Sequence, residues 1–286
     1  MRIAVLVTCY NRVAVTIRGL GSLVRALDSM RDVTYDLFIV DDGSADDTWS
    51  ALVETFPQAY VERGNGHLFW NRGMCRAYQL ARRYGSFSDY LLFNDDVVVN
   101  PDALKTVVNE YWDLNSRFPA ILAAATVGDD GCVSYSGFKR TNRFRPLSLQ
   151  KMAIPESTQP CDTFNGNFVL VPSAFFDSVG GLDCRYVHAY GDIDLGYTAV
   201  KLGVQPHLSS VPIGTCSPNV ERTRRGEVLK SFRGTWGKED SLGQRLYFLR
   251  KNSPLIAQFV TIPLTVLRYG VDQTVRFSKK MWFERM

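Results

Sequence analysis

The sequence has 286 residues, of which 45% are hydrophobic, 22% charged and 12% aromatic, a composition typical of a folded globular protein. Disordered and low-complexity chains are excluded, because they lack this share of apolar side chains. The formal net charge is only +4, so nucleic-acid binding through bulk charge is not expected. The charge is uneven, however, because residues 217–286 hold fourteen Lys and Arg against six Asp and Glu.

The six cysteines are scattered singly along the chain, with no CxxC pair. This pattern favours neither a disulfide scaffold nor a zinc site, and we expect reduced thiols in a cytoplasmic protein. The cysteines are Cys9, Cys75, Cys132, Cys161, Cys184 and Cys216.

Two apolar segments were considered as membrane elements. Met1–Val7 is too short for a signal peptide and predicts a buried strand. Pro254–Leu267 is interrupted by Gln258 and Pro263, which leaves it short of the ~20 apolar residues that a spanning helix needs. The second segment is compatible with lying on a membrane surface, and not with crossing it.

The first 120 residues alternate between apolar strand-length runs and helical spacing. In chain order the expected elements are a strand at 2–7, a helix over 17–27, a strand at 37–40, a helix over 49–56, a strand at 89–93 and a helix that starts at Asn100-Pro101. This alternation predicts an α/β fold with a mostly parallel sheet and helices on both faces.

The pattern is looser after residue 120. We expect a hairpin from 120–127 and 132–138, a long loop over 143–160, a strand at 167–171, a short helix that ends at Gly180-Gly181, a helix over 191–202 and a helix over 242–249.

Polar clusters follow three of the expected strands, at Thr8–Arg12, Asp41–Ser44 and Asn94–Asp96. Ligands of open α/β sheets bind beyond the carboxyl ends of the strands, so these clusters mark a candidate site. The paired acids in the last cluster suit a divalent cation held together with substrate phosphates. The alternative for this cluster is a polar turn before a capped helix.

Four segments carry a resemblance to glycosyltransferase family 2. They are VLVTCYNR at 5–12, VDDGS at 40–44, NDD at 94–96 and GGLDCRYVHAYGDIDLGYTAVKLG at 180–203, in the family's order over residues 3–205. The resemblance implies a Rossmann-like GT-A fold, a nucleotide-sugar donor and inversion at the anomeric carbon. The block GNGHLFWNRGMCRA at 64–77 further resembles rhamnosyltransferase-like members that build bacterial surface polysaccharides.

Three parts of the chain are expected. With the resemblance, residues 1–120 would form the nucleotide-sugar half and 121–216 the acceptor half of a catalytic domain. The excess of Lys and Arg over 217–286 predicts a basic, partly amphipathic helical C-terminal extension. The donor would be a UDP- or dTDP-sugar, and the acceptor a saccharide or a saccharide linked to polyprenyl diphosphate.

On the donor side, the resemblance implies that Asp96 holds Mn²⁺ or Mg²⁺ at the diphosphate. The residues expected around the nucleotide-sugar are Thr8, Tyr10, Arg12, Asp41, Asp42, Arg72, Asn94 and Asp95. Asn94 replaces the first Asp of the family's DxD motif, and Cys216 stands near the position where some members have a metal-binding His.

On the acceptor side, Asp192 would be the catalytic base. His188 and Asp194 would contact the acceptor. Gly191 replaces the Glu that usually precedes this Asp. Because Asp192 lies at a helix start, we expect the helix dipole to lower its pKa. Its alternative role is that of an N-cap.

Two other functions remain open at this stage. One is a sugar nucleotidyltransferase, although the glycine- and lysine-rich loop of that class is missing after the first strand. The other is an inactive nucleotide-sugar-binding protein. For the basic extension we expect acceptor contacts by Arg222, Arg224, Arg225, Lys230 and Arg233, and peripheral binding of 254–286 to the inner face of the plasma membrane.

Overall fold

The computed structural model describes residues 1–217 and 242–283, with side chains described to residue 269. The chain divides into two compact units. The first comprises residues 1–139 and 150–217, and the second comprises 140–149 together with the described C-terminal helices. The five basic side chains expected to contact the acceptor, at positions 222–233, lie outside the described residues.

The first unit is built on an eight-stranded sheet in the order β11-β14-β6-β13-β4-β1-β2-β3. The bounds are β1 Arg2–Cys9, β2 Thr34–Asp41, β3 Tyr60–Arg63, β4 Asp89–Phe93, β6 Ala120–Ala123, β11 Gln159–Pro160, β13 Phe168–Pro172 and β14 Gln205–Leu208. β1, β2, β3 and β4 run parallel, whereas β13 is antiparallel to both of its neighbours. The mixed, mostly parallel α/β fold expected from the sequence is confirmed.

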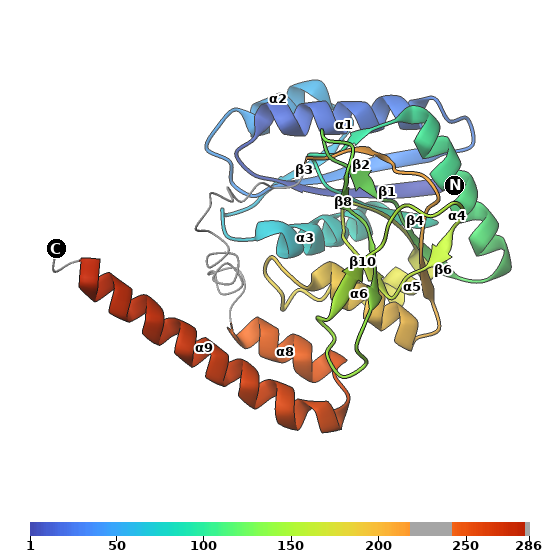
Figure 1. Ribbon diagram of the computed structural model, residues 1–286. Coiled ribbons are helices and arrows are strands. Elements are labelled where there is room, and N and C mark those ends of the chain that lie inside the picture. The colour runs from blue at the N-terminus through green and yellow to red at the C-terminus, as the bar shows by residue number, and fades with distance from the viewer. Residues whose placement is uncertain (218–241, 284–286) are drawn as a thin grey trace. The chain divides into compact units, whose positions relative to one another are not determined.

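Helices cover both faces of this sheet (Figure 1). The helices are α1 Val13–Asp28, α2 Thr48–Thr55, α3 Phe69–Tyr84, α4 Pro101–Arg117, α5 Ser173–Ser178 and α6 Gly191–Lys201. Ile3, Val5 and Val7 of β1 belong to the core under α1, α2 and α4, while Ala4 and Leu6 belong to the core under α3, α5 and α6. Strand β1 is therefore buried on both faces, which explains its uninterrupted apolar sequence.

The expected hairpin is correct only in its outer part. β6 joins the large sheet, and only β7 Thr126–Val127 and β8 Val133–Tyr135 pair antiparallel. These two strands form a small sheet with β5 Val98–Val99 and β15 Gly214–Thr215. β9 Gly137–Arg140, β10 Leu149–Lys151 and β12 Thr163–Phe164 form a third sheet.

The second unit contains α8 Leu242–Asn252 and α9 Leu255–Phe283, which pack against each other. Their corner is held by Gln258, whose Nε2 donates to the carbonyls of Arg250 and Ser253, both at 3.0 Å. Across the described part of the chain, no helix combines the length and apolarity needed to cross a bilayer.

Candidate active site

The loops after β1 and β2 are joined to each other at the carboxyl edge of the sheet. Asn11 N–H donates to Ser44 Oγ at 2.8 Å, and Asn11 Oδ1 accepts from Ala45 N–H at 2.7 Å. Asn11 takes a left-handed backbone conformation, which asparagine tolerates better than most residues. Two of the three polar clusters therefore form one continuous rim.

Arg12 connects this rim to the third cluster. Its Nη2 lies 2.6 Å from Asp95 Oδ1, and its Nη1 lies 3.2 Å from Asp96 Oδ2. Burial lowers the pKa of Arg12, but the two carboxylates raise it more, so the net shift is upward. Arg12 was expected around the nucleotide-sugar, and in the structure its guanidinium binds both acids of the NDD motif.

The two acids of that motif have different environments. Asp95 is fully buried, and its Oδ2 accepts from Thr16 Oγ1 of α1 at 2.5 Å. Burial raises the pKa of Asp95 to about 6, although Arg12 and Thr16 lower it. Asp96 is partly exposed, so it is the carboxylate of the pair that can reach a ligand.

Cys216 lies directly beside Asp96, with its Sγ 3.4 Å from Asp96 Oδ1. Burial and the adjacent Asp96 raise the pKa of Cys216 to about 12, so the thiol is protonated at neutral pH and donates to the carboxylate. This position follows β15 and corresponds to the place where a metal-binding His was considered.

Asp96 could ligate a divalent cation, but the described residues around it do not form a complete metal site. The described residues contain no cluster of three or more His, Cys, Asp or Glu that could hold a metal. A cation bound here would need Asp96 together with oxygens of a ligand and water. This arrangement is usual for Mg²⁺ and Mn²⁺ bound with phosphates.

The acids after β2 also have separate environments. Asp41 is fully buried, and its Oδ1 accepts from Ser44 N–H at 3.1 Å and from Ser44 Oγ. Its Oδ2 has no hydrogen-bond partner among the described residues. A buried carboxylate oxygen without a donor is costly, so Asp41 is ready to accept a hydrogen bond from a ligand.

Asp42, by contrast, holds the start of α3. Its Oδ1 accepts from Gly66 N–H at 3.0 Å, and its Oδ2 accepts from Leu68 and Phe69 N–H, each at 2.9 Å. Both oxygens are thus engaged with backbone. The carboxylate fixes the glycine-containing turn that leads into α3.

The other two residues expected at the base differ in exposure. Thr8 is buried, and its Oγ1 donates to the Val40 carbonyl at 3.2 Å. A Cβ at Gly73 of α3 would lie 2.2 Å from that Oγ1, so Thr8 fixes the approach of α3 to the sheet. Tyr10 is half-exposed, and its ring is accessible to a ligand.

Trp70 links α3 to the NDD motif. Its Nε1 donates to Asn94 Oδ1 at 2.6 Å. A Cβ at Gly166 would lie 2.5 Å from Trp70 Cζ2 and 3.4 Å from Asp192 Cβ, so the indole packs between the donor-side residues and α6. Asn94, which replaces the first Asp of the usual motif, accepts this hydrogen bond from Trp70 through its neutral amide oxygen.

Asp192 is the second residue of α6 and is partly exposed. Its Oδ2 accepts from Gly166 N–H at 3.0 Å, and its Oδ1 from Ile193 N–H at 2.8 Å. Burial nevertheless raises the pKa of Asp192, so the expected downward shift is wrong. The N-cap position of α6 is occupied by Tyr190, which excludes the alternative role as the N-cap.

The two residues expected to contact the acceptor lie on different sides of Asp192. His188 is exposed on the loop before α6, and its ring meets the Phe69 ring edge-on at 6.4 Å. Asp194 is buried, and its Oδ1 accepts from Tyr186 OH at 3.2 Å. The geometry therefore leaves His188 accessible to an acceptor and gives Asp194 a structural contact.

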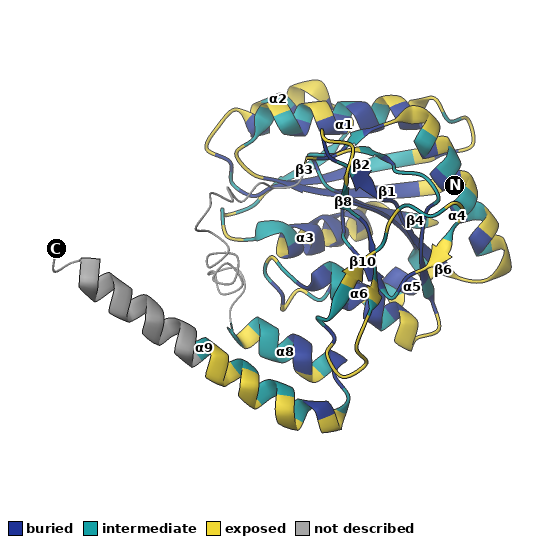
Figure 2. Ribbon diagram, viewed as in Figure 1, coloured by how far each residue is buried: buried dark blue, intermediate teal, exposed yellow. Residues whose placement is uncertain are grey.

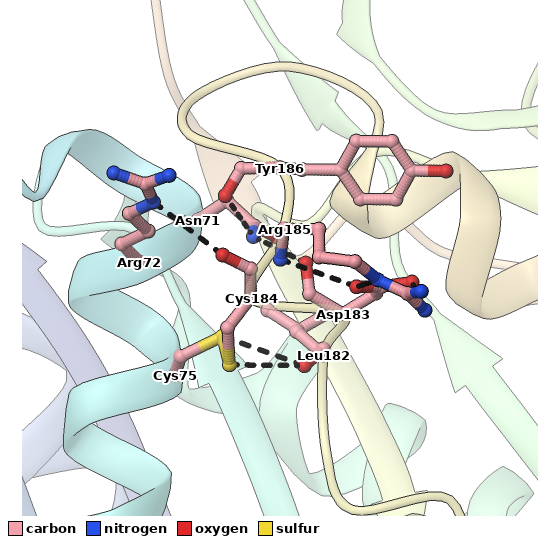
Figure 3. Close-up of a disulfide and its surroundings, with 8 residues drawn as sticks. All are labelled: Asn71, Arg72, Cys75, Leu182, Asp183, Cys184, Arg185 and Tyr186. Carbon is pink, nitrogen blue, oxygen red and sulfur yellow. Dashed lines mark hydrogen bonds and ion pairs between the residues drawn. A yellow bond between two sulfur atoms is a disulfide. The ribbon is translucent and has the colours of Figure 1, made fainter. Parts of the chain in front are cut away.

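Arg72 is exposed on α3, and its Nε donates to the Cys184 carbonyl at 3.4 Å. The same helix is bonded covalently to that loop, because Cys75 and Cys184 form a disulfide (Figure 3). The expectation that all cysteines are reduced is therefore wrong. Single, widely separated cysteines gave no signal, because the pairing depends on how α3 packs against a loop 109 residues away in sequence.

Three residues that build this site were not predicted from the sequence. Asn71 donates from Nδ2 to the carbonyls of Asp183 and Tyr186, at 2.9 and 3.0 Å, and so holds the loop before Asp192. Neither Trp70 nor Gly166 was among the residues expected at the site. The dense FWNRG segment was the only signal for Trp70 and Asn71, and Gly166 had none, because their partners lie in distant parts of the chain.

Comparison with known proteins places the fold and the family. Searches of curated proteins give no significant match. A mannosyltransferase, PcManGT from Pyrobaculum calidifontis, solved with GDP-Man and Mn²⁺, has a TM-score of 0.55 at 14% identity and covers 96% of this chain and 75% of its own. Residues 1–349 of TarS from S. aureus give 0.51 at 14% identity, with 76% of this chain and 60% of that one covered.

A third solved structure, GalNAc-T7 with UDP, GalNAc and Mn²⁺, gives a TM-score of 0.56 at 10% identity and covers 75% of this chain and 44% of its own. At these identities the likeness concerns the GT-A fold alone. The family model named Glycosyl transferase family 2 matches residues 4–153, which include the rim, Arg12 and the NDD motif. The chain thus belongs to glycosyltransferase family 2 and is a nucleotide-sugar-dependent glycosyltransferase.

Proposed function

We propose that this enzyme transfers a sugar from a UDP- or dTDP-sugar, with inversion, to a saccharide or lipid-linked saccharide in the synthesis of a bacterial surface polysaccharide. The observation that carries the catalytic part is one continuous set of contacts within the first unit. It runs from Arg12 through Asp95 and Asp96, by way of Asn94 and Trp70, to Gly166 and Asp192.

The donor end of this set suits a nucleoside diphosphate. Asp41 Oδ2 would accept from an N–H of the base or a hydroxyl of the ribose, and Tyr10 would flank the base. Asp96 would hold Mn²⁺ or Mg²⁺ with the diphosphate, and such a cation neutralises charge on the leaving group. The bound Mn²⁺ in the structures of PcManGT and GalNAc-T7 supports this choice of cation.

The acceptor end suits proton abstraction. Asp192 would take the proton of the acceptor hydroxyl while that oxygen forms a bond to the anomeric carbon. The bond from this carbon to the diphosphate breaks on the opposite side, and the nucleoside diphosphate leaves with the electron pair. The N–H groups of Gly166 and Ile193 aim the carboxylate, and its raised pKa makes it a stronger base than an ordinary aspartate.

The rhamnosyltransferase-like specificity rests on the segment at 64–77. In the structure this segment is the turn held by Asp42 and the first half of α3, and it contributes Trp70 and Asn71 to the site. Trp70, which contacts the NDD motif, and Asn71, which holds the loop before Asp192, are well situated to shape the pocket for the donor hexose. His188, exposed opposite Phe69, would contact the acceptor.

Screening nucleotide-sugars for thermal stabilisation with Mn²⁺ tests the donor, because a ligand at 100 times its Kd stabilises the folded state by about 2.7 kcal/mol. Asp192→Asn should keep this stabilisation and lose transfer by about 10²- to 10⁴-fold. Asp96→Asn should lose the Mn²⁺-dependent part of nucleotide binding. Asp32→Asn, at an exposed carboxylate outside the site, is the matched control. Near-normal transfer by Asp192→Asn would refute the assignment of the base.

A further inference from the structure

The second unit carries a pocket that the glycosyl-transfer site does not use. Its volume is about 390 Å³, and its walls come from the 140–149 loop, α8 and α9. Leu147, Leu249 and Leu264 give it an apolar interior, and Arg145, Arg245 and Arg268 supply three guanidinium groups, one from each wall. Among the described lining residues there is no Asp or Glu.

The loop that contributes Arg145 is held in place by its own hydrogen bonds. Thr141 N–H donates to the Ser148 carbonyl at 2.8 Å, and the hydroxyl oxygens of Thr141 and Ser148 lie 2.7 Å apart. Within the loop, Arg145 N–H donates to the Asn142 carbonyl at 3.1 Å, and Ser148 N–H to the Arg145 carbonyl at 2.9 Å. Arg145 is therefore presented by a closed turn to the pocket that the loop shares with α8 and α9.

The described part of α9 carries many exposed residues (Figure 2), and several of them are large and apolar. The side chains Leu255, Ile256, Phe259, Val260, Leu264 and Leu267 are between 55% and 78% exposed. Five of them, Ile256, Phe259, Val260, Leu264 and Leu267, recur at helical spacing and share one face of the helix. Val260 and Leu264 belong both to this face and to the pocket, so the two surfaces are continuous.

The pairing of an apolar face with a pocket of guanidinium groups indicates one kind of partner. Neighbouring exposed apolar side chains on one helix face are typical of an interaction surface. An apolar partner alone would not need three arginines, and a soluble anion would not need the apolar stripe. A phospholipid satisfies both, because its acyl chains bury the stripe while its phosphate pairs with the guanidinium groups.

We propose that α9 lies in the interface of an anionic bilayer and that the pocket binds the phosphate headgroup and the upper acyl chain of one phospholipid. This inference does not depend on the identity of the donor or acceptor. Phosphate recognition by three arginines on three elements differs from a diffuse attraction to charge. Replacing these three arginines should therefore reduce the affinity for anionic vesicles more than replacing three basic residues outside the pocket.

The experiment is co-sedimentation of the full chain with phosphatidylcholine vesicles, with and without phosphatidylglycerol. The proposal expects strong preference for the anionic vesicles. The variant Arg145→Gln/Arg245→Gln/Arg268→Gln should lose about tenfold or more of its affinity for them. The matched variant Arg143→Gln/Arg250→Gln/Lys251→Gln removes the same charge from the same unit outside the pocket and should lose clearly less. Equal losses in the two variants would overturn the pocket assignment.

The apolar face is tested separately by Ile256→Ser/Phe259→Ser, which should reduce binding to both kinds of vesicle. Its control, Val53→Ser/Leu202→Ser, changes exposed apolar residues of the first unit and should bind normally. Absence of vesicle binding by the wild type overturns the proposal, as does a dimer that only the α9 variant dissociates. Because no nucleotide-sugar is used, such a failure leaves glycosyl transfer, measured with a soluble acceptor, unaffected.

Discussion

Gly191 and Asn71 are so close that a Cβ at position 191 would lie 1.6 Å from Asn71 Oδ1. Asn71 also donates to two carbonyls of the loop that leads to Asp192. The Glu that usually precedes the catalytic Asp therefore has no room here. The departure at Gly191 fits the presence of Asn71 as the residue that holds this loop, and it leaves Asp192, the carboxylate proposed as the base, in place.

This relationship predicts a specific coupling between the two positions. Gly191→Ala should destabilise the protein by about 1–3 kcal/mol, the usual cost of forcing extra atoms into a packed site. In an Asn71→Ala background the same substitution should cost much less, because the clashing oxygen is gone. Chemical denaturation of the four proteins of this cycle measures the coupling. An identical cost in both backgrounds would show that Asn71 is not the obstacle.

The pH dependence of transfer should reflect the raised pKa of Asp192. A general base must be deprotonated, so kcat falls as the pH drops through its pKa. Because burial raises this pKa, the fall should occur at higher pH than for an ordinary aspartate. The measurement is the pH profile of kcat at saturating donor, which keeps titrations that affect donor binding out of the comparison. A flat kcat down to the ordinary pKa of aspartate, 3.8, would contradict the assignment.

Asp95 gives a prediction about stability. Its pKa is about 6 in the folded protein against an ordinary value of 3.8, so between these values the folded state binds more protons than the unfolded state. The contribution of Asp95 to the free energy of unfolding must then increase as the pH falls from about 6 to 3.8. The cost of burying its charge is largest above pH 6. The effect is at most about 3 kcal/mol.

The test compares the wild type with Asp95→Asn, which cannot titrate at this position. As the pH is lowered from about 7 to about 4, the free energy of unfolding of the wild type should improve relative to the variant. Asp32→Asn, at an exposed acid, should show no such trend relative to the wild type. A difference between wild type and Asp95→Asn that moves in the opposite direction would mean that the ion pair with Arg12 outweighs burial.

Local sequence patterns were sufficient for much of the fold. Asn100 caps α4 through its side chain, as its position before Pro101 predicts, and the strand ends carry their polar clusters as expected. The pattern could not show that Arg12 turns towards Asp95 and Asp96, 83 and 84 residues away. Nor could it show that Asp42 is engaged with the backbone of the next loop, because both contacts depend on the packing of α1 and α3.

The disulfide is the clearest example of a feature that only packing determines, and it gives the last prediction. Cys75–Cys184 joins α3 to the loop before α6 and closes a long stretch of chain, so it restricts the unfolded state. Cys184→Ser should lower the free energy of unfolding by about 2–4 kcal/mol. A thiol reductant should lower the free energy of unfolding of the wild type by a similar amount and leave that of the variant unchanged. Cys132→Ser, at an exposed free thiol, is the matched control and should behave as the wild type.

A count of reactive thiols tests directly whether the Cys75–Cys184 disulfide is present. Denatured but unreduced protein should react with a thiol reagent at Cys9, Cys132, Cys161 and Cys216 only, and reduction should expose the other two of the six cysteines. Six reactive thiols before reduction would show that the bond is absent in the isolated protein. Because Asn71 holds the same loop by hydrogen bonds to Asp183 and Tyr186, transfer should survive reduction with the loop still in place. We therefore expect loss of this disulfide to affect stability and not catalysis.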